Sequence, residues 1–364
     1  MGTQRTQNRK VTRAVQVGTV RVGGGAPISV QSMTNTPTGD VAATLAQVRA
    51  LEAAGCDIVR LAVPDKSCAA TFARLKEAGV RVPLVADIHF DSAIALECVA
   101  AGADKIRINP GNIGSEDKVA AVARACRERK IPIRIGVNGG SLEKHILARY
   151  GSPCAEALAE SALYHADLLR RFDFEDIVLS VKASSVGEMI RANELLSETT
   201  EFPLHLGVTE AGGIESGTIK SAIGIGSLLT RGIGDTVRVS LTADPLEEVR
   251  VARQILNILS PSRVGMDIVS CPTCGRTKID LISLLAAFEA AVDREGLRDL
   301  PVKVAIMGCA VNGPGEARDA DIGIAGGQGD ALLFRHGETV AKYPQDEIVG
   351  VLIDELKRMK QPHD

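Results

Sequence analysis

Eight alternations of a short apolar run and an amphipathic helical segment, between residues 28 and about 245, constrain the fold of this 364-residue chain most strongly. Most runs are rich in Ile, Val and Leu, as expected for strands covered by helices. Several intervening Ala-rich segments end in Gly, which favours a helix C-cap. The runs are ISVQSMT (28–34), DIVRLAV (57–63), PLVADIHF (83–90), KIRINP (105–110), PIRIGVN (132–138), DIVLSVKAS (176–184), PLHLGVTE (203–210) and TVRVSLT (236–242).

Eight strand–helix units in about 220 residues predict an α/β fold of the (β/α)8 TIM-barrel type. A doubly wound open sheet is the alternative. Against it, no GxGxxG motif follows the first predicted strand. The glycines at 224–226 follow an acidic loop rather than a strand, so they are a weak signal for dinucleotide binding.

A second, smaller domain is predicted after the barrel. The segment 257–265 (NILSPSRVG) is typical of a linker with a turn at Pro261. Beyond it we expect a strand ending at CPTCG (271–275), a helix near 278–294, a strand leading into Cys309, a hairpin, and a C-terminal helix over 346–359. The predicted domains are therefore a barrel over 1–256 and a compact α/β domain over 257–364.

Composition excludes several classes of partner. The net charge is −3 and aromatic residues make up 3% with no Trp, which argues against binding to nucleic acid. No apolar run is long enough to cross a bilayer, and the start lacks the apolar stretch of a secretory signal. We therefore expect a cytoplasmic protein that binds no membrane.

Most of the eight cysteines have an ordinary explanation. In a reducing compartment they are metal ligands, catalytic groups or buried side chains rather than disulfides. Five lie mostly among Ala, Leu and Val in helical patterns, where Cys behaves as a small buried hydrophobic residue. These five are Cys56, Cys68, Cys98, Cys126 and Cys154.

Charged side chains lie within or at the ends of the predicted strands. In a barrel enzyme, side chains near the carboxyl ends of strands build the active site. Two cations ~8 Å apart repel by roughly 2 kcal/mol at an effective dielectric of 20, so five converging cations favour an anionic, phosphate-like ligand. Ion pairs between barrel layers are the alternative. The cations are Arg60, Arg107, Arg134, Lys182 and Arg238; Asp87 and Glu210 are the acids, with His89, Asn109, Asn138 and Ser240 nearby.

Three further cysteines and one glutamate form a candidate metal site. Cys271 and Cys274 lie in CPTCG, whereas Cys309 and Glu316 lie in GCAVNGPGE (308–316). CPxCG also occurs in zinc ribbons, but a ribbon needs a second CxxC, which this chain lacks. Three thiolates can hold three irons of a [4Fe–4S] cube, leaving one iron for a harder, more labile ligand such as a carboxylate. Spacing alone does not decide between this role for Glu316 and a solvated loop carboxylate.

The two cysteine strings together closely resemble the bacterial 4-hydroxy-3-methylbut-2-enyl diphosphate synthases of the non-mevalonate isoprenoid pathway. The resemblance covers nearly the whole chain. It includes QSMTNTPT (31–38), VRLAVP (59–64), ADIHF (86–90), RINPGN (107–112), RIGVNGGSLEK (134–144), SVKAS (180–184), HLGVTEAGG (205–213) and IGDTVRVSLTADP (233–245). The lack of a long insertion between the two domains favours the bacterial form over the plant type.

The resemblance implies an iron–sulfur oxidoreductase. The implied reaction is reductive ring opening and dehydration of 2-C-methyl-D-erythritol 2,4-cyclodiphosphate, with electrons delivered singly by reduced flavodoxin or ferredoxin. It also implies a homodimer, in which the cluster domain of one subunit closes over the barrel of the other.

Residue roles follow from the same resemblance. One [4Fe–4S] cluster per subunit would be held by Cys271, Cys274, Cys309 and Glu316. Glu210 would be the acid–base group. The implied substrate-binding residues are Arg60, Asp87, Arg107, Arg134, Asn138, Lys182, Arg238 and Ser240.

Two rival functions remain open on the residues alone. One is a redox-inactive barrel enzyme, such as an aldolase or a pterin-type synthase, that carries a structural zinc site. The other is a zinc-stabilised binding protein without catalysis. Metal content discriminates both from an iron–sulfur enzyme.

Overall fold

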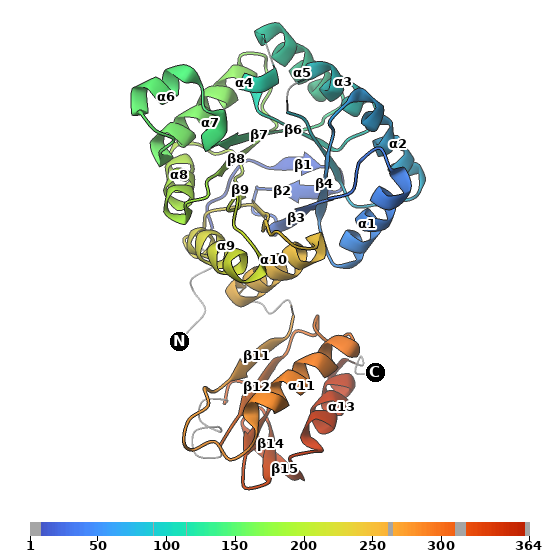
Figure 1. Cartoon of the computed structure of the whole chain (residues 1–364), viewed down its shortest axis with the longest axis vertical. Coiled ribbons are helices and arrows are strands. Elements are labelled where there is room, and N and C mark those ends of the chain that lie inside the picture. The colour runs from blue at the N-terminus through green and yellow to red at the C-terminus, as the bar shows by residue number, and fades with distance from the viewer. Residues whose placement is uncertain (1–8, 90, 114, 261–264, 310–317, 361–364) are drawn as a thin grey trace. The chain divides into compact units, whose positions relative to one another are not determined.

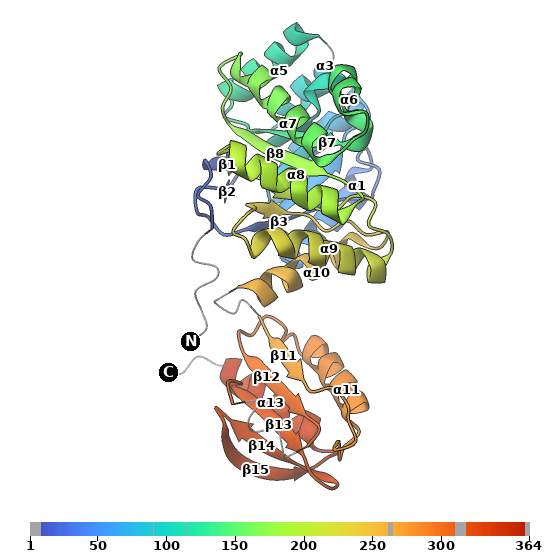
Figure 2. The same cartoon turned by 90° about the vertical axis from the view of Figure 1, so that its left-hand side faces the viewer.

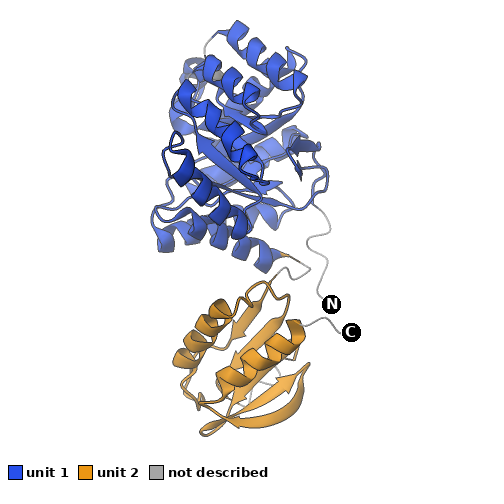
Figure 3. Cartoon of the chain, turned by 90° about the vertical axis from the view of Figure 1, so that its right-hand side faces the viewer, with its two compact units in different colours: residues 1–259 blue, residues 260–364 orange. Residues whose placement is uncertain are grey.

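The structure is a computed structural model that describes residues 9–89, 91–113, 115–260, 265–309 and 318–360. The chain divides into two compact units, Met1–Leu259 and Ser260–Asp364 (Figure 3). Helix α10 extends through Leu259, so the first three residues of the predicted linker are helical. In the part of the chain that is described, no helix is both long enough and apolar enough to span a membrane.

The first unit is a parallel eight-stranded barrel, which confirms the predicted fold (Figure 1). The strand order is β8-β7-β6-β5-β4-β3-β10-β9, and a parallel bridge from Leu179 to Leu204 links the two ends. The strands are β3 (Ser29–Met33), β4 (Ile58–Ala62), β5 (Leu84–Asp87), β6 (Lys105–Ile108), β7 (Ile133–Asn138), β8 (Ile177–Lys182), β9 (His205–Leu206) and β10 (Thr236–Val237). The last two are much shorter than the apolar runs that predicted them.

Helices surround the barrel, and their apolar faces pack against the outward side chains of the strands in one continuous core. The short helices η1 (Lys66–Ala69), η2 (Gly139–Ser141), α4 (Pro110–Ile113) and α6 (Lys144–Tyr150) lie in the connections. The longer helices are α1 (Val41–Ala53), α2 (Ala70–Glu77), α3 (Ser92–Ala100), α5 (Glu116–Glu128), α7 (Ala155–Arg170), α8 (Val186–Thr199), α9 (Ile214–Leu229) and α10 (Pro245–Leu259).

A hairpin that the sequence patterns did not predict covers one end of the barrel. Strands β1 (Val15–Val17) and β2 (Val20–Val22) pair antiparallel. Their buried valines contact Ile58 and Val85, which lie at the amino-terminal ends of the barrel strands. Figures 1 and 2 show the hairpin lying across that end. The barrel is therefore closed opposite the face where its strands end.

Among the described residues, the second unit is a mixed five-stranded sheet with two helices, as the sequence predicted in outline. The order is β11-β12-β13-β14-β15, parallel as far as β13 and antiparallel beyond it. Its own apolar core packs between the sheet and the helices. The elements are β11 (Asp267–Ser270), α11 (Leu281–Arg294), β12 (Lys303–Met307), β13 (Ile322–Gly326), β14 (Asp330–Arg335), β15 (Glu338–Pro344) and α13 (Ile348–Lys360).

Two minor predictions are settled by the helices. Gly224 lies inside α9, where an added Cβ would meet the Met189 side chain at 2.6 Å, so this glycine serves close packing rather than a nucleotide. Four of the five cysteines expected in the core are buried. The exception is Cys154, which is only half-buried because it is the N-cap residue of α7.

Candidate active site in the barrel and cysteine site in the second unit

The strand register turns the predicted cations toward one another inside the barrel. Paired residues on neighbouring strands face the same side, and Asp87 pairs with Arg107, which in turn pairs with Arg134. Arg60 shares its face with Ile58, which contacts the closing hairpin rather than the helices. The same alternation turns Lys182 inward; Arg238 follows directly after β10. The five cations therefore share the barrel interior.

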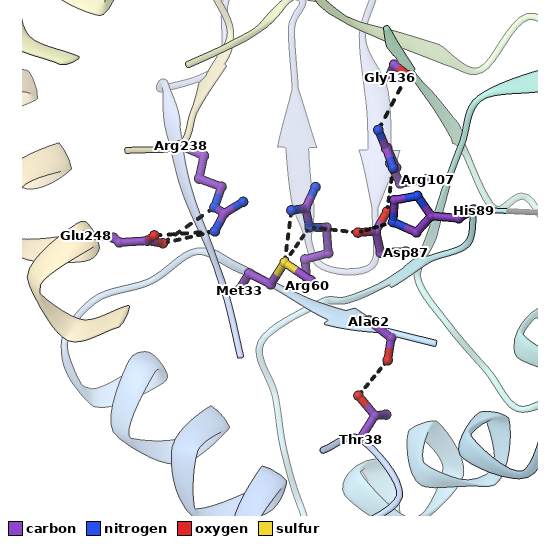
Figure 4. Close-up of polar contacts among 10 residues, drawn as sticks. All are labelled: Met33, Thr38, Arg60, Ala62, Asp87, His89, Arg107, Gly136, Arg238 and Glu248. Carbon is purple, nitrogen blue, oxygen red and sulfur yellow. Dashed lines mark hydrogen bonds and ion pairs between the residues drawn. The ribbon is translucent and has the colours of Figure 1, made fainter. Parts of the chain in front are cut away.

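Asp87 is the centre of one group of contacts (Figure 4). Its carboxylate lies 3.0 Å from Nη1 of Arg107, 3.6 Å from Nε of Arg60 and 3.5 Å from Nε2 of His89. Burial opposes ionisation of Asp87, but the Arg60 charge, the His89 hydrogen bond and the Arg107 charge together hold its pKa well below the ordinary range. Asp87 therefore remains a carboxylate that orients two guanidinium groups.

Arg60 also donates to a sulfur atom. Its Nη2 and Nε lie 2.9 and 3.2 Å from Sδ of Met33 on the neighbouring strand β3 (Figure 4). Thioether sulfur is a weak acceptor, so it restrains the guanidinium while neutralising none of its charge. Met33 therefore helps to hold Arg60 in place and leaves its charge to be balanced by Asp87 and by a ligand.

Glu248 supplies the second carboxylate and comes from helix α10 rather than from a strand. Its Oε1 lies 3.3 Å from Nη2 of Arg238. It also accepts from Ser32 Oγ at 2.8 Å and from the Leu241 amide at 3.1 Å. The carboxylate is buried and receives donors from strand β3 and from the connection that follows β10, so it fixes Arg238 in position.

Two glycines leave room for the cationic heads. A Cβ on Gly136 would lie 2.5 Å from Nε of Arg107, and a Cβ on Gly207 would lie 2.8 Å from Nζ of Lys182. Arg107 also donates from Nη2 to the Gly136 carbonyl at 3.4 Å. Any other residue at these two positions would push a cation out of place.

Burial and mutual repulsion make the charged forms of these groups unfavourable. Burial, opposed by Asp87, lowers the pKa of Arg60 to about 10. Burial, followed by repulsion from Arg238, lowers the pKa of Lys182 well below its usual value. Burial also lowers the pKa of Arg134, and Arg60 and Arg107 add to the effect. A site that raises the energy of several cations together favours an anionic ligand.

The remaining predicted residues lie at the end of a strand or in the connections that follow the strands. Asn138 is the exposed last residue of β7, Ser240 lies half-buried beyond β10, and Glu210 is exposed beyond β9. Glu210 adopts a left-handed backbone with φ of +53°. This conformation costs a non-glycine residue about 1–3 kcal/mol and occurs preferentially at functional sites.

Three interior residues escaped the sequence analysis: Lys105, His205 and Glu248. Lys105 and His205 are fully buried at inward positions of β6 and β9. Burial lowers the pKa of His205, and the Arg134 charge lowers it further. Strand periodicity would have turned Lys105 inward with Arg107. No sequence signal separates Glu248 from the exposed acids of its helix.

In the second unit, adjacent strand ends carry two of the predicted cluster cysteines. Strands β11 and β12 are parallel and in register, so Cys271 and the Gly308–Cys309 pair follow them at the same edge of the sheet. The Gly308 amide donates to Cys271 Sγ at 3.2 Å. Cys274 is exposed in the next turn, where hydrogen bonding to the Arg276 backbone lowers the pKa of its thiol. Glu316 lies outside the described residues.

The chemistry of these donors fits an iron–sulfur cluster. An amide that donates to a cysteine sulfur is the contact that tunes such clusters, and thiolates are the ligands they require. Among the described residues, no three His, Cys, Asp or Glu side chains are already gathered as metal ligands. Cys271 and Cys309 are thus placed at one edge, without a completed ligand set.

The first unit is a (β/α)8 barrel with a cationic interior, and the second is an α/β unit with cysteines at its strand ends. Together these features define a barrel enzyme for an anionic substrate. The GcpE TIM-barrel domain matches residues 12–253, and the GcpE protein C-terminal domain matches residues 267–358. The chain therefore belongs to the GcpE family, whose members similar to this chain are oxidoreductases.

Two relatives show how close the similarity is. A protein of Ruminiclostridium cellulolyticum is 55% identical over 96% of this chain and 98% of its own length. One of Geobacillus thermodenitrificans is 52% identical over 98% and 94%. Both are named 4-hydroxy-3-methylbut-2-en-1-yl diphosphate synthase (flavodoxin).

A solved structure supports the fold alone. The dihydropteroate synthase of Thermus thermophilus aligns with a TM-score of 0.50 at 15% identity, over 68% of this chain and 97% of its own. That likeness shows a shared barrel architecture and carries no function across.

Proposed function

We propose that this chain catalyses the reductive ring opening and dehydration of 2-C-methyl-D-erythritol 2,4-cyclodiphosphate to 4-hydroxy-3-methylbut-2-enyl diphosphate in isoprenoid precursor synthesis. The proposal rests mainly on the charge balance of the barrel interior. There, buried cations outnumber the carboxylates that pair with them. A cyclic diphosphate supplies the missing negative charge in a form that guanidinium groups bind well. The names of the relatives point to the same product.

The barrel, over 1–256, would bind and orient the substrate. Asp87 holds Arg60 and Arg107, and Glu248 holds Arg238, so three guanidinium groups are oriented before the ligand arrives. Such preorganisation avoids reorganisation during the reaction. Glu210 would exchange the proton needed for loss of water. The proposed substrate-binding residues are Arg60, Asp87, Arg107, Arg134, Asn138, Lys182, Arg238 and Ser240.

The second unit, over 257–364, would hold one [4Fe–4S] cluster through Cys271, Cys274, Cys309 and Glu316. When bound, the cluster supplies single-electron transfer to the substrate. The Gly308 amide would stabilise the Cys271 thiolate. We propose reduced flavodoxin as electron donor, with ferredoxin as the alternative, and a cytoplasmic homodimer as the working form.

Anaerobic purification followed by metal analysis and turnover tests this function. The expected protein is brown, absorbs broadly near ~400 nm, contains about four irons and four sulfides per chain, and converts the cyclic diphosphate with reduced flavodoxin. A colourless protein with one zinc and no turnover would instead support a redox-inactive barrel enzyme or a zinc-stabilised binding protein.

The division of labour between the units has its own test. Arg107→Ala should weaken substrate binding at least tenfold, because it removes a guanidinium from the barrel interior, and should leave the cluster spectrum unchanged. Arg49→Ala is the matched control, since Arg49 donates to the Ala78 carbonyl on the surface. Loss of iron from the Arg107 variant would argue against the division.

A further inference from the structure

Two largely buried ionisable side chains that the proposed reaction does not use contact each other beyond strand β7. Glu143 follows the last residue of β7 by five positions and is the N-cap of helix α6, whereas His165 lies within helix α7. Oε1 of Glu143 is hydrogen-bonded to Nε2 of His165. The His165 side chain is 1% exposed and that of Glu143 is 13% exposed, so the contact is shielded from water.

The contact uses one nitrogen of the imidazole ring. Among the described residues, no hydrogen-bond partner reaches the buried Nδ1 of His165. Burial opposes ionisation of Glu143, but hydrogen bonding, chiefly from His165, outweighs burial and lowers the pKa of its carboxyl. An ionised carboxylate only accepts, so Nε2 of His165 is the donor. Glu143 depends on that donor, because a buried charge without a partner is costly.

The residues from Asn138 to Glu143, here called the β7 segment, are connected by hydrogen bonds. Oγ of Ser141 accepts from the Asn138 amide at 3.2 Å and donates to the Asn138 carbonyl at 3.1 Å. Nδ2 of Asn109, which follows strand β6, donates to the Ser141 carbonyl at 3.4 Å. The β7 segment is therefore held from β6 through Asn109 and from α7 through Glu143.

The β7 segment begins at a residue that faces the barrel mouth. Asn138 is exposed and pairs in register with Lys182 at the end of β8, so the two side chains point to the same side. Both belong to the residues that we assign to the substrate. A displacement of about 1 Å in a group that positions a substrate can already weaken catalysis. The anchors of the β7 segment therefore bear on binding.

Helices α6 and α7 lie side by side (Figure 1), and a second contact joins them at the other end of α6. Glu160 of α7 accepts from the Tyr150 hydroxyl at 2.8 Å and from Nη1 of Arg149. The Arg149 side chain is exposed, and exposed pairs of this kind contribute less than about 1 kcal/mol. This contact restrains the end of α6 and leaves the β7 segment to Glu143.

We propose that His165 is a positioning residue: it holds Glu143, which fixes the β7 segment and keeps Asn138 directed at the substrate. The consequence for the substrate rests on the proposed function. His165 is buried within α7, so it acts through Glu143 rather than on the ligand.

Hydrogen exchange of the anaerobic holoenzyme tests the first step without substrate. Glu143→Ala removes the carboxylate from the connection and leaves helix α7 unaltered. We expect the amides of residues 138–147 to exchange at least tenfold faster in this variant and in His165→Leu, since the Leu147 amide donates to the Glu143 carbonyl. Glu160→Ala is the matched control and should keep wild-type exchange in those residues. Unchanged exchange in Glu143→Ala would overturn the proposal, even if His165→Leu does not fold.

Steady-state kinetics with the cyclic diphosphate test the second step. His165→Leu should lower kcat/KM roughly tenfold, and His165→Gln, whose amide supplies an N–H in place of Nε2, should restore most of it. In an Asn138→Ala background, His165→Leu should cause no further loss, because no side chain remains to be positioned. A glutamine that does not rescue, or losses that add independently, would contradict the proposal. A wild-type protein without turnover would count against the proposed function, and hydrogen exchange would still decide the role of His165.

Discussion

The carboxylate of Glu248 lies 3.3 Å from the guanidinium of Arg238, although the first residue belongs to an outer helix and the second to the barrel interior. The same carboxylate accepts from Ser32 and from the Leu241 amide. One side chain thus connects helix α10, strand β3 and the connection that carries Ser240. The orientation of Arg238 in the barrel interior therefore depends on a residue that lies outside the barrel strands.

Glu248→Gln should destabilise the fold and weaken anion binding together. Arg238 would lose its buried counter-charge, which costs about 3 kcal/mol. We expect that loss in urea unfolding, and roughly tenfold weaker pyrophosphate binding by calorimetry. Glu247→Gln is the control, because Glu247 pairs with Arg250 on the surface, where such pairs contribute less than about 1 kcal/mol. Equal behaviour of the two variants would contradict a positioning role.

Asp87→Asn should change how stability depends on pH. The folded pKa of Asp87 lies below its unfolded value of about 3.9, so its contribution is complete above that pH and declines as the pH falls below it. The difference in unfolding free energy between wild type and variant should therefore be about 3 kcal/mol at pH 6 and about 1 kcal/mol smaller at pH 3. Urea titrations at both pH values measure it. Asp173→Asn, at a 93% exposed side chain, should show no such change.

Gly136→Ala should damage binding more than folding. The new Cβ would lie 2.5 Å from Nε of Arg107, and the flexible side chain can move away at the expense of its bond to Asp87. We expect roughly tenfold weaker pyrophosphate binding and a Tm within a few degrees of wild type. Gly226→Ala is the control, since its Cβ would meet nothing within 4 Å on helix α9. Unaltered affinity in the Gly136 variant would show that the space is not needed.

Glu316→Ala should separate cluster binding from catalysis. Three thiolates remain to hold iron, so iron content should persist, while loss of the harder ligand should lower turnover roughly 100-fold. Anaerobic iron analysis and turnover with reduced flavodoxin measure the two effects. Glu338→Ala, at an exposed position of β15, serves as control. Turnover equal to wild type would rule out a role for Glu316 as the labile ligand.

The barrel was predictable because its outward strand residues and its helices carry regular apolar patterns. Val59 and Leu61 pack against the helices, and between them Arg60 points inward, so the charge within the apolar run marked the site. The β1–β2 hairpin was not predictable, since two three-residue strands are too short for a periodic pattern.

The partners of the cations were also beyond sequence reasoning. Glu248 stands beside Glu247 in a helix, and only the packing of α10 on the barrel makes one buried and leaves the other half-exposed. Lys105 begins its strand rather than ending it, so a rule based on strand ends overlooks it. Contacts between elements distant in the chain depend on register and tilt, which residue patterns do not encode.

The β1–β2 hairpin also has a consequence for the kinetics of the enzyme. Because the hairpin closes one end of the barrel, substrate and product must enter and leave through the same opening at the other end. Product should therefore inhibit competitively with respect to the cyclic diphosphate, because product cannot leave through the closed end while substrate enters through the open one.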